Sequence, residues 1–534
     1  MTIRKLLVAN RGEIAVRVFR TCRELGIATV AVVAPNDQGA LHARVADETV
    51  EILSYLFSEE HIRAAKQAGA DAIHPGYGFL AENPDFAEAV EAAALQFLGP
   101  TPDALRAGGD KLEAKRIAAA AGVPALSAGE PDEIGFPLVL KAAAGGGGRG
   151  MRVVRERGEL AEAVEAAGRE AKAAFGDDRL FAERFLERPR HVEVQLLGDG
   201  DGGVVALGER ECSIQRRHQK VLEEAPSPGI GDELRRAVTD AAVAFGRAIR
   251  YRSAGTVEFV VDGGVFYLLE LNGRIQVEHP VTELVTGLDL VAEQIGIATG
   301  GRLPEEGRRS GHAVEVRLYA EDPTTFLPQT GRIERLRLPA GVRVDAGVEE
   351  GDEVGIGYDP MIAKLVAHGG NREEALDCLE NALAETEVSG IVTNLELLRW
   401  LVRHPVVRSG RTTTAFLTEY PPLSEPPPEA QRPWRGAWRL NLPPPPPLPP
   451  PELDAVAATP GAESSELTAP MPGTVIRVNV AAGDRVHPRQ PLVVLEAMKM
   501  ETPLVSPYEA VVRSVHVREG DRVAGGALLV ELEE

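Results

Sequence analysis

The sequence predicts an N-terminal α/β domain, an α+β core, a β-rich subdomain and, after a proline-rich stretch, a separate all-β domain. Three observations support this order. Short apolar runs alternate with helical patterns over the first 110 residues. Residues 421–460 hold 15 of the 39 prolines in the 534-residue chain. Beyond them, a 24-residue pattern occurs twice at a constant offset of 37 residues.

The first domain is predicted over residues 1–110. KLLVAN (5–10) and ATVAVVA (28–34) are typical of strands, and EIAVRVFRTCRELG (13–26) between them has the periodicity of a helix. DAIHPGY (71–77) follows a third helical segment. This β-α-β order predicts a parallel sheet covered by helices.

Residues 111–311 and 312–420 mix helices with short strands. TVEFVVDGGVFYLLEL (256–271) carries an Asp-Gly-Gly turn and predicts a β-hairpin. REEALDCLENALAET (372–386) predicts a helix in the β-rich subdomain. Residues 421–466, with five consecutive prolines at 443–447, predict an extended linker.

The last domain, 467–534, contains the repeat: residues 473–496 match residues 510–533. Two such copies predict a small, flattened β-sandwich or barrel with internal symmetry. AMKMETPLVSP (497–507) falls between the copies, which places Lys499 at an exposed turn. Lys499 is then either an ordinary solvated lysine or a lysine that a modifying enzyme can reach.

Charge and cysteine content narrow the class of protein. The formal net charge of −22 disfavours nucleic acid and anionic membranes as partners. Three cysteines too far apart for a metal cluster fit reduced thiols in a cytoplasmic protein. The apolar run at the N-terminus is too short for a signal peptide or a membrane span.

A glycine-rich segment indicates a phosphate-binding loop. Lys141 ends the apolar run FPLVLK, and AAAGGGGRGM (142–151) follows directly. Consecutive glycines expose backbone amides that can fold over phosphates. A plain linker is the alternative, and the lysine at the strand end favours the phosphate interpretation. The GK[ST] ending of a P-loop is absent.

The predicted hairpin and the segment after it carry the polar side chains of a metal and anion site. Glu258 falls opposite Glu270 or within one residue of it, and Asn272 shares a strand face with Glu270. Carboxylates facing each other across a sheet repel, and Mg²⁺ or Mn²⁺ would resolve that repulsion with oxygen ligands. If residues 274–278 are extended, Arg274, Gln276 and Glu278 point to one side. The alternative is a set of solvated surface charges.

These segments together resemble the biotin carboxylase family over residues 3–420. The matching motifs, in order, are RKLLVANRGEIAVRVFR, HPGYGFLAEN, GDK, KAAAGGGGRGM, RHVEVQ, CSIQRRHQKVLEEAP, NGRIQVEHPVTE and HAVEVRLYAEDP. The resemblance implies an ATP-grasp core that uses bicarbonate and ATP with Mg²⁺ or Mn²⁺. EAMKM (496–500) resembles the biotin attachment signature, with lipoate as the runner-up, and implies covalent biotin on Lys499.

The resemblance also implies roles for individual residues. Those that would bind ATP are Lys111, Lys141, Gly145, Gly146, Gly147, Gly148, Gly150, Met151, Glu183, Leu186, His191, Gln215 and His218. Those that would ligate metal are Glu258, Glu270 and Asn272. Those that would hold bicarbonate are Lys220, Arg274, Gln276, the amide of Val277 and Glu278. Glu278 resembles the general base and Arg317 the group that stabilises deprotonated biotin. Arg184 and Gly273 depart from the residues common in the family.

The domain order resembles the α subunit of bacterial acyl-CoA carboxylases. It implies a separate carboxyltransferase (β) chain that passes the carboxyl group to acetyl-CoA, propionyl-CoA or a related acyl-CoA. Other implied partners are a biotin protein ligase and a second copy, as a homodimeric carboxylase within a hetero-oligomer. Trp434 and Trp438 form either a partner-docking patch or a segment that folds back on its own chain. The alternatives are another acceptor such as pyruvate or urea, a non-catalytic carrier, and another ATP-grasp ligase.

Overall fold

The computed structural model describes residues 2–143, 151–216, 219–305, 309–425, 466–471, 473–497 and 500–533. Within it the chain forms two compact units that divide between Ser424 and Glu425. Each unit has its own apolar core. Residues 426–465 of the predicted linker, with Trp434 and Trp438, lie outside the described residues, as do the glycines of 145–150, His218 and Lys499.

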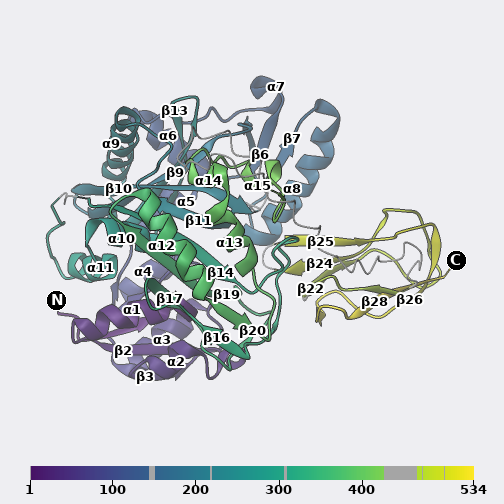
Figure 1. The fold of residues 1–534 in the computed structure, drawn as a ribbon, viewed down its shortest axis with the longest axis horizontal. Helices are drawn as coiled ribbons and strands as arrows, with labels where there is room; N and C mark the ends of the chain where they lie inside the picture. The colour runs from purple at the N-terminus through teal and green to yellow at the C-terminus, as the bar shows by residue number, and fades with distance from the viewer. Residues whose placement is uncertain are drawn as a thin grey trace, which may run out of the picture. The chain divides into compact units, whose positions relative to one another are not determined.

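The chain begins with a five-stranded parallel sheet in the order β3-β2-β1-β4-β5. Its elements are β1 (Lys5–Val8), α1 (Gly12–Glu24), β2 (Ala28–Val33), α2 (Leu41–Val45), β3 (Glu48–Glu51), α3 (Ser58–Ala68), β4 (Ala72–His74), α4 (Pro84–Ala92) and β5 (Gln96–Phe97). The predicted α/β fold is therefore confirmed (Figure 1). The short strands β3 and β5 complete the sheet beyond the strands that the sequence indicates.

Both faces of this sheet are covered because consecutive residues of β1 point to opposite sides. Leu6 and Val8 pack in one core cluster with α1 and with α11 (Leu290–Ala298). Leu7 packs in another cluster with α3 and α4. A continuous apolar strand is what a sheet buried on both faces requires.

A three-stranded antiparallel sheet, β7-β6-β8, follows. The elements of this region are α5 (Pro102–Gly109), α6 (Lys111–Ala120), α7 (Pro131–Ile134), β6 (Leu138–Ala142), β7 (Arg152–Val154), α8 (Leu160–Phe175) and β8 (Leu180–Arg184). The glycine-rich segment joins β6 to β7, which are neighbours in the sheet.

The largest sheet has eight strands in the order β13-β12-β9-β10-β11-β14-β19-β17. These and the adjoining helices are β9 (Arg190–Asp199), β10 (Val204–Arg216), β11 (Gln219–Ala225), α9 (Asp232–Ala248), β12 (Arg252–Asp262), β13 (Val265–Asn272), α10 (His279–Thr286), β14 (His312–Tyr319), β17 (Arg343–Ala346) and β19 (Met361–Gly369). The sheet runs across residue 311, where the sequence places a domain boundary. The boundaries at 110, 311, 420 and 466 stay predictions.

Short elements complete the first unit. They are β15 (Gly331–Arg332), β16 (Arg335–Arg337), β18 (Glu353–Val354), α12 (Arg372–Glu385), β20 (Glu387–Ser389), α13 (Leu395–Arg403), α14 (Pro405–Arg408) and α15 (Phe416–Glu419). Helix α12 is the one predicted at 372–386, and it packs on β14 and β19 (Figure 1). No helix among the described residues is both long and apolar enough to cross a bilayer.

The hairpin of β12 and β13 forms as predicted. Asp262 pairs with Val265, and the two glycines between them have φ values of +57° and +84°. A two-residue turn with positive φ at both positions matches the twist of the strands, and glycine adopts it without strain. This register sets Glu258 directly opposite Glu270.

One local expectation is wrong. Residues 274–278 are not an extended strand, because the chain leaves β13 at Asn272 and turns into α10, with Glu278 as its N-cap residue. Pro280 in the first turn favours this helix start, because proline has the φ that the turn needs and lacks an N–H that would go unused there.

The second unit is a sandwich of two four-stranded sheets, β21-β28-β26-β23 and β25-β24-β22-β27. Its strands are β21 (Glu466–Thr468), β22 (Gly473–Val478), β23 (Arg485–Val486), β24 (Pro491–Ala497), β25 (Met500–Val505), β26 (Ala510–Val515), β27 (Arg522–Val523) and β28 (Leu528–Glu533). The starts of β22, β23 and β24 recur 37 residues later at β26, β27 and β28. The predicted repeat and all-β fold are thus confirmed.

Candidate active site

The site is built around Lys220 on β11. Its ammonium group lies 2.5 Å from Glu193 Oε2, 2.9 Å from Glu258 Oε1 and 2.5 Å from Glu278 Oε1. Burial alone would lower the pKa of Lys220, but the three carboxylates outweigh it and hold the pKa well above its ordinary value. We call Lys220 and these three glutamates the Lys220 cluster.

Glu278 sits at the start of α10 and is fully buried. Its second oxygen accepts a hydrogen bond from Arg317 Nη2 at 3.0 Å. Burial would raise the pKa of Glu278, yet Lys220, Arg317 and Arg210 outweigh burial and hold it well below its ordinary value. Glu278 is therefore an ionised acceptor in a largely dry place.

Arg274 and Gln276 join this centre although their segment is a turn. Arg274 Nη1 donates to Gln276 Oε1 at 2.7 Å, and Gln276 Nε2 donates to Glu258 Oε1 at 3.0 Å. Arg274 Nε also donates to Oε2 of Glu82, a residue of the N-terminal sheet region, at 3.0 Å. The carbonyl of Val277 accepts from Lys364 at 2.8 Å, which fixes the turn.

The predicted metal ligands occupy the end of the β12–β13 hairpin. Asn272 Nδ2 donates to Glu258 Oε1 at 2.8 Å, and Glu270 Oε2 lies 3.2 Å from Lys111 Nζ. Burial would raise the pKa of Glu258, but Lys220 and His191 hold it below its ordinary value. Ionised carboxylate and amide oxygens on one hairpin fit Mg²⁺ or Mn²⁺, which favour oxygen ligands.

The predicted nucleotide residues fall into two groups. Lys141 Nζ lies 2.5 Å from the buried carboxylate of Glu183, which Lys115 also contacts. Burial would raise the pKa of Glu183, and the two lysines lower it below its ordinary value. Lys115, four residues after Lys111 on α6, was not predicted, although helical spacing places both on one face.

The second group adjoins the metal ligands. His191 Nε2 lies 2.9 Å from Glu258 Oε2, and Gln215 contacts His191 Nδ1. Leu186 follows β8 and Met151 directly precedes β7, and both are half-buried. The His191–Glu258 pair thus connects the nucleotide set to the Lys220 cluster, and the Lys111–Glu270 pair connects it to a second predicted metal ligand.

Gly273 departs from the family pattern for a steric reason. A Cβ at this position would stand 2.8 Å from Leu105 Cδ2, well inside van der Waals contact. The Gly273 amide also donates to Glu82 Oε1 at 3.0 Å. Arg184, the other departure, is exposed at the end of β8.

Several charged residues at the centre were missed. Arg210, fully buried, bonds Glu193 Oε1, Gln195 and Thr282, and Arg317 Nε donates to Glu223 at 2.6 Å. Glu193 lies in the motif RHVEVQ and Glu223 in KVLEEAP, which were noted only as matches, whereas Arg210 lies outside the quoted motifs. The sole available signal was charged residues within otherwise apolar strands.

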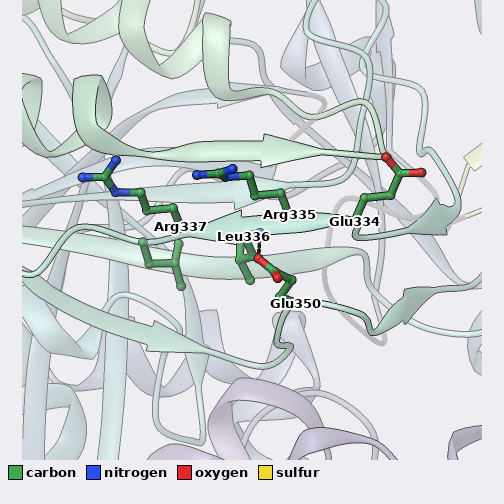
Figure 2. A pocket seen from close by; sticks show the side chains of 6 residues that line it. Glu334, Arg335, Leu336, Arg337 and Glu350 are labelled. Carbon is green, nitrogen blue, oxygen red and sulfur yellow. Dashed lines mark hydrogen bonds between the residues drawn. The ribbon is translucent and has the colours of Figure 1, made fainter.

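A separate hollow of about 580 Å³ lies along β16. It is lined by Glu334, Arg335, Leu336, Arg337, Leu338 and Glu350. Figure 2 shows the arginines on one side of the strand and Leu336 on the other, where Glu350 accepts from its amide. The arginines are well exposed and face Glu387, and no predicted site residue lines this hollow.

The fold and the site together define an enzyme of the ATP-grasp class. Family models match residues 2–105 (Biotin carboxylase, N-terminal domain), 117–306 (Carbamoyl-phosphate synthase L chain, ATP binding domain), 315–419 (Biotin carboxylase C-terminal domain) and 465–532 (Biotin-requiring enzyme). The biotin carboxylase of Haemophilus influenzae is 47% identical over 441 residues, 78% of this chain and 98% of that protein. The chain belongs to the biotin carboxylase family, whose members are ATP-dependent ligases.

Two further relatives bear on ligands and assembly. The mitochondrial methylcrotonoyl-CoA carboxylase subunit alpha of Oryza sativa is 48% identical over 445 residues, covering 78% of this chain and 60% of the relative. The chain thus matches about 60% of the length of that relative. The biotin carboxylase domain dimer of the Hydrogenobacter thermophilus 2-oxoglutarate carboxylase, solved with MgADP, ADP and bicarbonate, is 43% identical with a TM-score of 0.77, covering 79% of this chain and 98% of that chain. The predicted cofactor classes, biotin and Mg²⁺-nucleotide, are confirmed at the level of the family.

Proposed function

We propose that the chain uses ATP and bicarbonate to carboxylate a biotin on Lys499 of its own C-terminal domain. The observation that carries this proposal is the buried contact of Lys220 and Arg317 with Glu278, beside the oxygen-rich end of the β12–β13 hairpin. Lys220 and Arg317 beside an ionised base suit the binding of a small anion that must lose a proton.

Lys220, Arg274, Gln276 and the amide of Val277 would bind bicarbonate. Phosphoryl transfer from ATP to a bicarbonate oxygen gives ADP and carboxyphosphate, and the surrounding cations offset the charge on the transferred group. Glu278 accepts the bicarbonate proton, so that carboxyphosphate can break down to CO₂ and phosphate. Because its pKa is lowered, Glu278 acts by its position rather than by a pKa matched to neutral pH.

Neighbouring residues would bind the nucleotide and the metal. Lys111, Lys141 and the glycines of 145–150 would bind phosphates, with His218 near them. Glu183, Leu186, Met151, His191 and Gln215 would border the nucleoside. Glu258, Glu270 and Asn272 would hold Mg²⁺, which when bound adds positive charge beside the phosphates.

Arg317 is the residue for the biotin half of the reaction. Its guanidinium lies between Glu278 and Glu223, with its donors fixed by both. A fixed guanidinium would be suited to stabilise negative charge on the ureido carbonyl oxygen of a bound biotin.

The strands on either side of Lys499 in the sequence support its role as the attachment point. Ala497 at the end of β24 pairs with Met500 at the start of β25, so that Met498 and Lys499 are the two residues that join these strands. A short connection between two paired strands suits a tethered group that a biotin protein ligase must reach.

The proposal extends to the molecule that accepts the carboxyl group and to the partner chains. The likeness to methylcrotonoyl-CoA carboxylase subunit alpha supports an acyl-CoA acceptor and a separate carboxyltransferase chain. The likeness to a biotin carboxylase domain dimer supports a homodimer. Three free cysteines are consistent with a cytoplasmic location. Trp434 and Trp438 remain candidates for docking the carboxyltransferase.

The test compares Glu278→Gln with Glu224→Gln. Glu224 is an equally buried carboxylate, bonded to His312 and Arg372 rather than to the Lys220 cluster. We expect E278Q to lose bicarbonate-dependent ATP cleavage and E224Q to keep it while melting at a lower temperature. Near-normal bicarbonate-dependent cleavage in E278Q rejects the assignment of the base.

A further inference from the structure

Two buried glutamates face each other beside the site. Glu223 on β11 pairs directly with Glu315 on β14, and both side chains are completely buried. Directly opposed residues of antiparallel strands have Cβ atoms about 5 Å apart, within reach of two glutamate side chains. Neither residue was singled out by the sequence, and the catalytic steps proposed above use neither as an acid or base.

Their oxygens are left without donors. Glu223 Oε1 accepts from Arg317 Nε at 2.6 Å, whereas Glu223 Oε2 and both oxygens of Glu315 have no hydrogen-bond partner among the described residues. Buried acceptors without donors are rare in folded proteins, and two facing carboxylates also repel. A single proton between them removes the repulsion and gives two of the three oxygens a partner, because a protonated carboxyl group is itself a donor.

The cations near Glu315 contact other groups. Arg317 is shared between Glu223 and Glu278, and Lys220 serves its own cluster. The ammonium of Lys364, on β19, donates to the carbonyl of Val277 and lies 3.3 Å from Glu13. Glu315 makes no ion pair within the described residues.

Electrostatics agree with this arrangement. Burial raises the pKa of Glu315 well above its ordinary value, with Lys364 opposing and Glu223 adding to the rise. Burial also raises the pKa of Glu223 to about 7, although Arg317 pulls it down. The charged groups that influence the pair are therefore Arg317, Lys364, Lys220 and Glu278.

We propose that Glu315 is a neutral carboxylic acid that donates a hydrogen bond to the free oxygen of Glu223, and that this pair positions Arg317 for the biotin half of the reaction. The inference rests on the proposed function. Arg317 is held by Glu278 and Glu223 together. When Glu278 takes the bicarbonate proton, its attraction for Arg317 weakens, and Glu223 keeps the guanidinium in place.

The test separates the two half-reactions in the full chain. Bicarbonate-dependent ATP cleavage is measured in a K499R background, which cannot carry biotin. Transfer of labelled bicarbonate to the carrier is measured in the biotinylated chain. A parent chain that fails the first measurement refutes the proposed function; the variants below address the inference alone.

Glu223→Gln removes the charge that holds Arg317. We expect labelled transfer to fall about tenfold more than ATP cleavage, with KM for ATP within about twofold of the parent. A merely structural role would lower both rates together. Equal losses in E223Q, or no loss of transfer, overturn the role of Glu223.

Glu315→Leu and Glu315→Gln test the neutral acid. Leucine cannot donate and should reproduce the transfer defect, whereas glutamine keeps a neutral donor and should restore transfer to within about threefold of the parent. If the E315Q chain transfers label as poorly as the E315L chain, the proposal is overturned.

Infrared spectroscopy provides a measurement that does not depend on the folding of E315L. The carbonyl band of a protonated carboxyl group should be present in the parent chain at neutral pH and lost in E315Q. No difference between the two spectra overturns the proposal.

Discussion

Replacing Lys220 with methionine tests the electrostatic balance of the site. The ammonium lies within 2.9 Å of oxygens from Glu193, Glu258 and Glu278, all of them buried. Methionine keeps most of the side-chain volume and removes the only cation among the described residues that contacts all three. Removing one partner of a buried ion pair leaves an uncompensated charge and costs about 3–5 kcal/mol.

Arg210 still compensates Glu193, and Arg317 still compensates Glu278. We therefore expect the loss in K220M to be at the lower end, about 3 kcal/mol at pH 7.5 without nucleotide. The deficit should shrink as the pH falls, because the carboxylates left without Lys220 can then take protons.

The assay is urea unfolding of the first unit in the full chain, with tryptophan fluorescence as the signal that monitors unfolding. Lys66→Met, at an exposed position on α3, is the matched control and should change the unfolding free energy by less than about 0.5 kcal/mol. A K220M chain within about 1 kcal/mol of the parent at pH 7.5 would refute the idea that Lys220 balances the three carboxylates.

Two further predictions concern the first sheet and the glycine after β13. Burial lowers the pKa of His74 from 6.5 to about 4, and its Nδ1 accepts from the Gly76 amide while Nε2 bonds Gln294, so the ring must stay neutral. Because the pKa of His74 is lower in the folded chain, the neutral ring stabilises the fold fully above pH 6.5. This stabilisation is lost as the pH falls toward 4, and the loss amounts to about 3 kcal/mol. His74→Gln should flatten the acid limb of stability in calorimetry, and an unchanged limb contradicts the reasoning. Gly273→Thr should cost about 1–3 kcal/mol by overpacking against Leu105, and adding Leu105→Ala should recover part of it in urea unfolding; a neutral single variant would contradict the steric explanation.

The sequence predicted those parts of the fold that depend on local patterns. The β-α-β order, the Gly263–Gly264 hairpin turn and the 37-residue repeat each follow from spacing within a short window. The continuous eight-stranded sheet could not be predicted this way, because β11, β14 and β19 pair across long stretches of chain.

The site was predicted unevenly for a related reason. Glu258 and Glu270 lie on one hairpin, so their facing positions followed from the turn. Arg210 and Glu315 are charged residues buried in strands, and in a single sequence such residues cannot be distinguished from charges on a solvent face. Their partners come from other strands, and only the folded sheet identifies them.

Transfer of labelled carbon from bicarbonate to the biotinylated full-length chain tests the central claim most directly. The account predicts that label appears on the C-terminal domain only with ATP and Mg²⁺, and that both Lys499→Arg and Glu278→Gln prevent it. Label that appears without ATP, or that persists in the Lys499→Arg chain, would contradict the account.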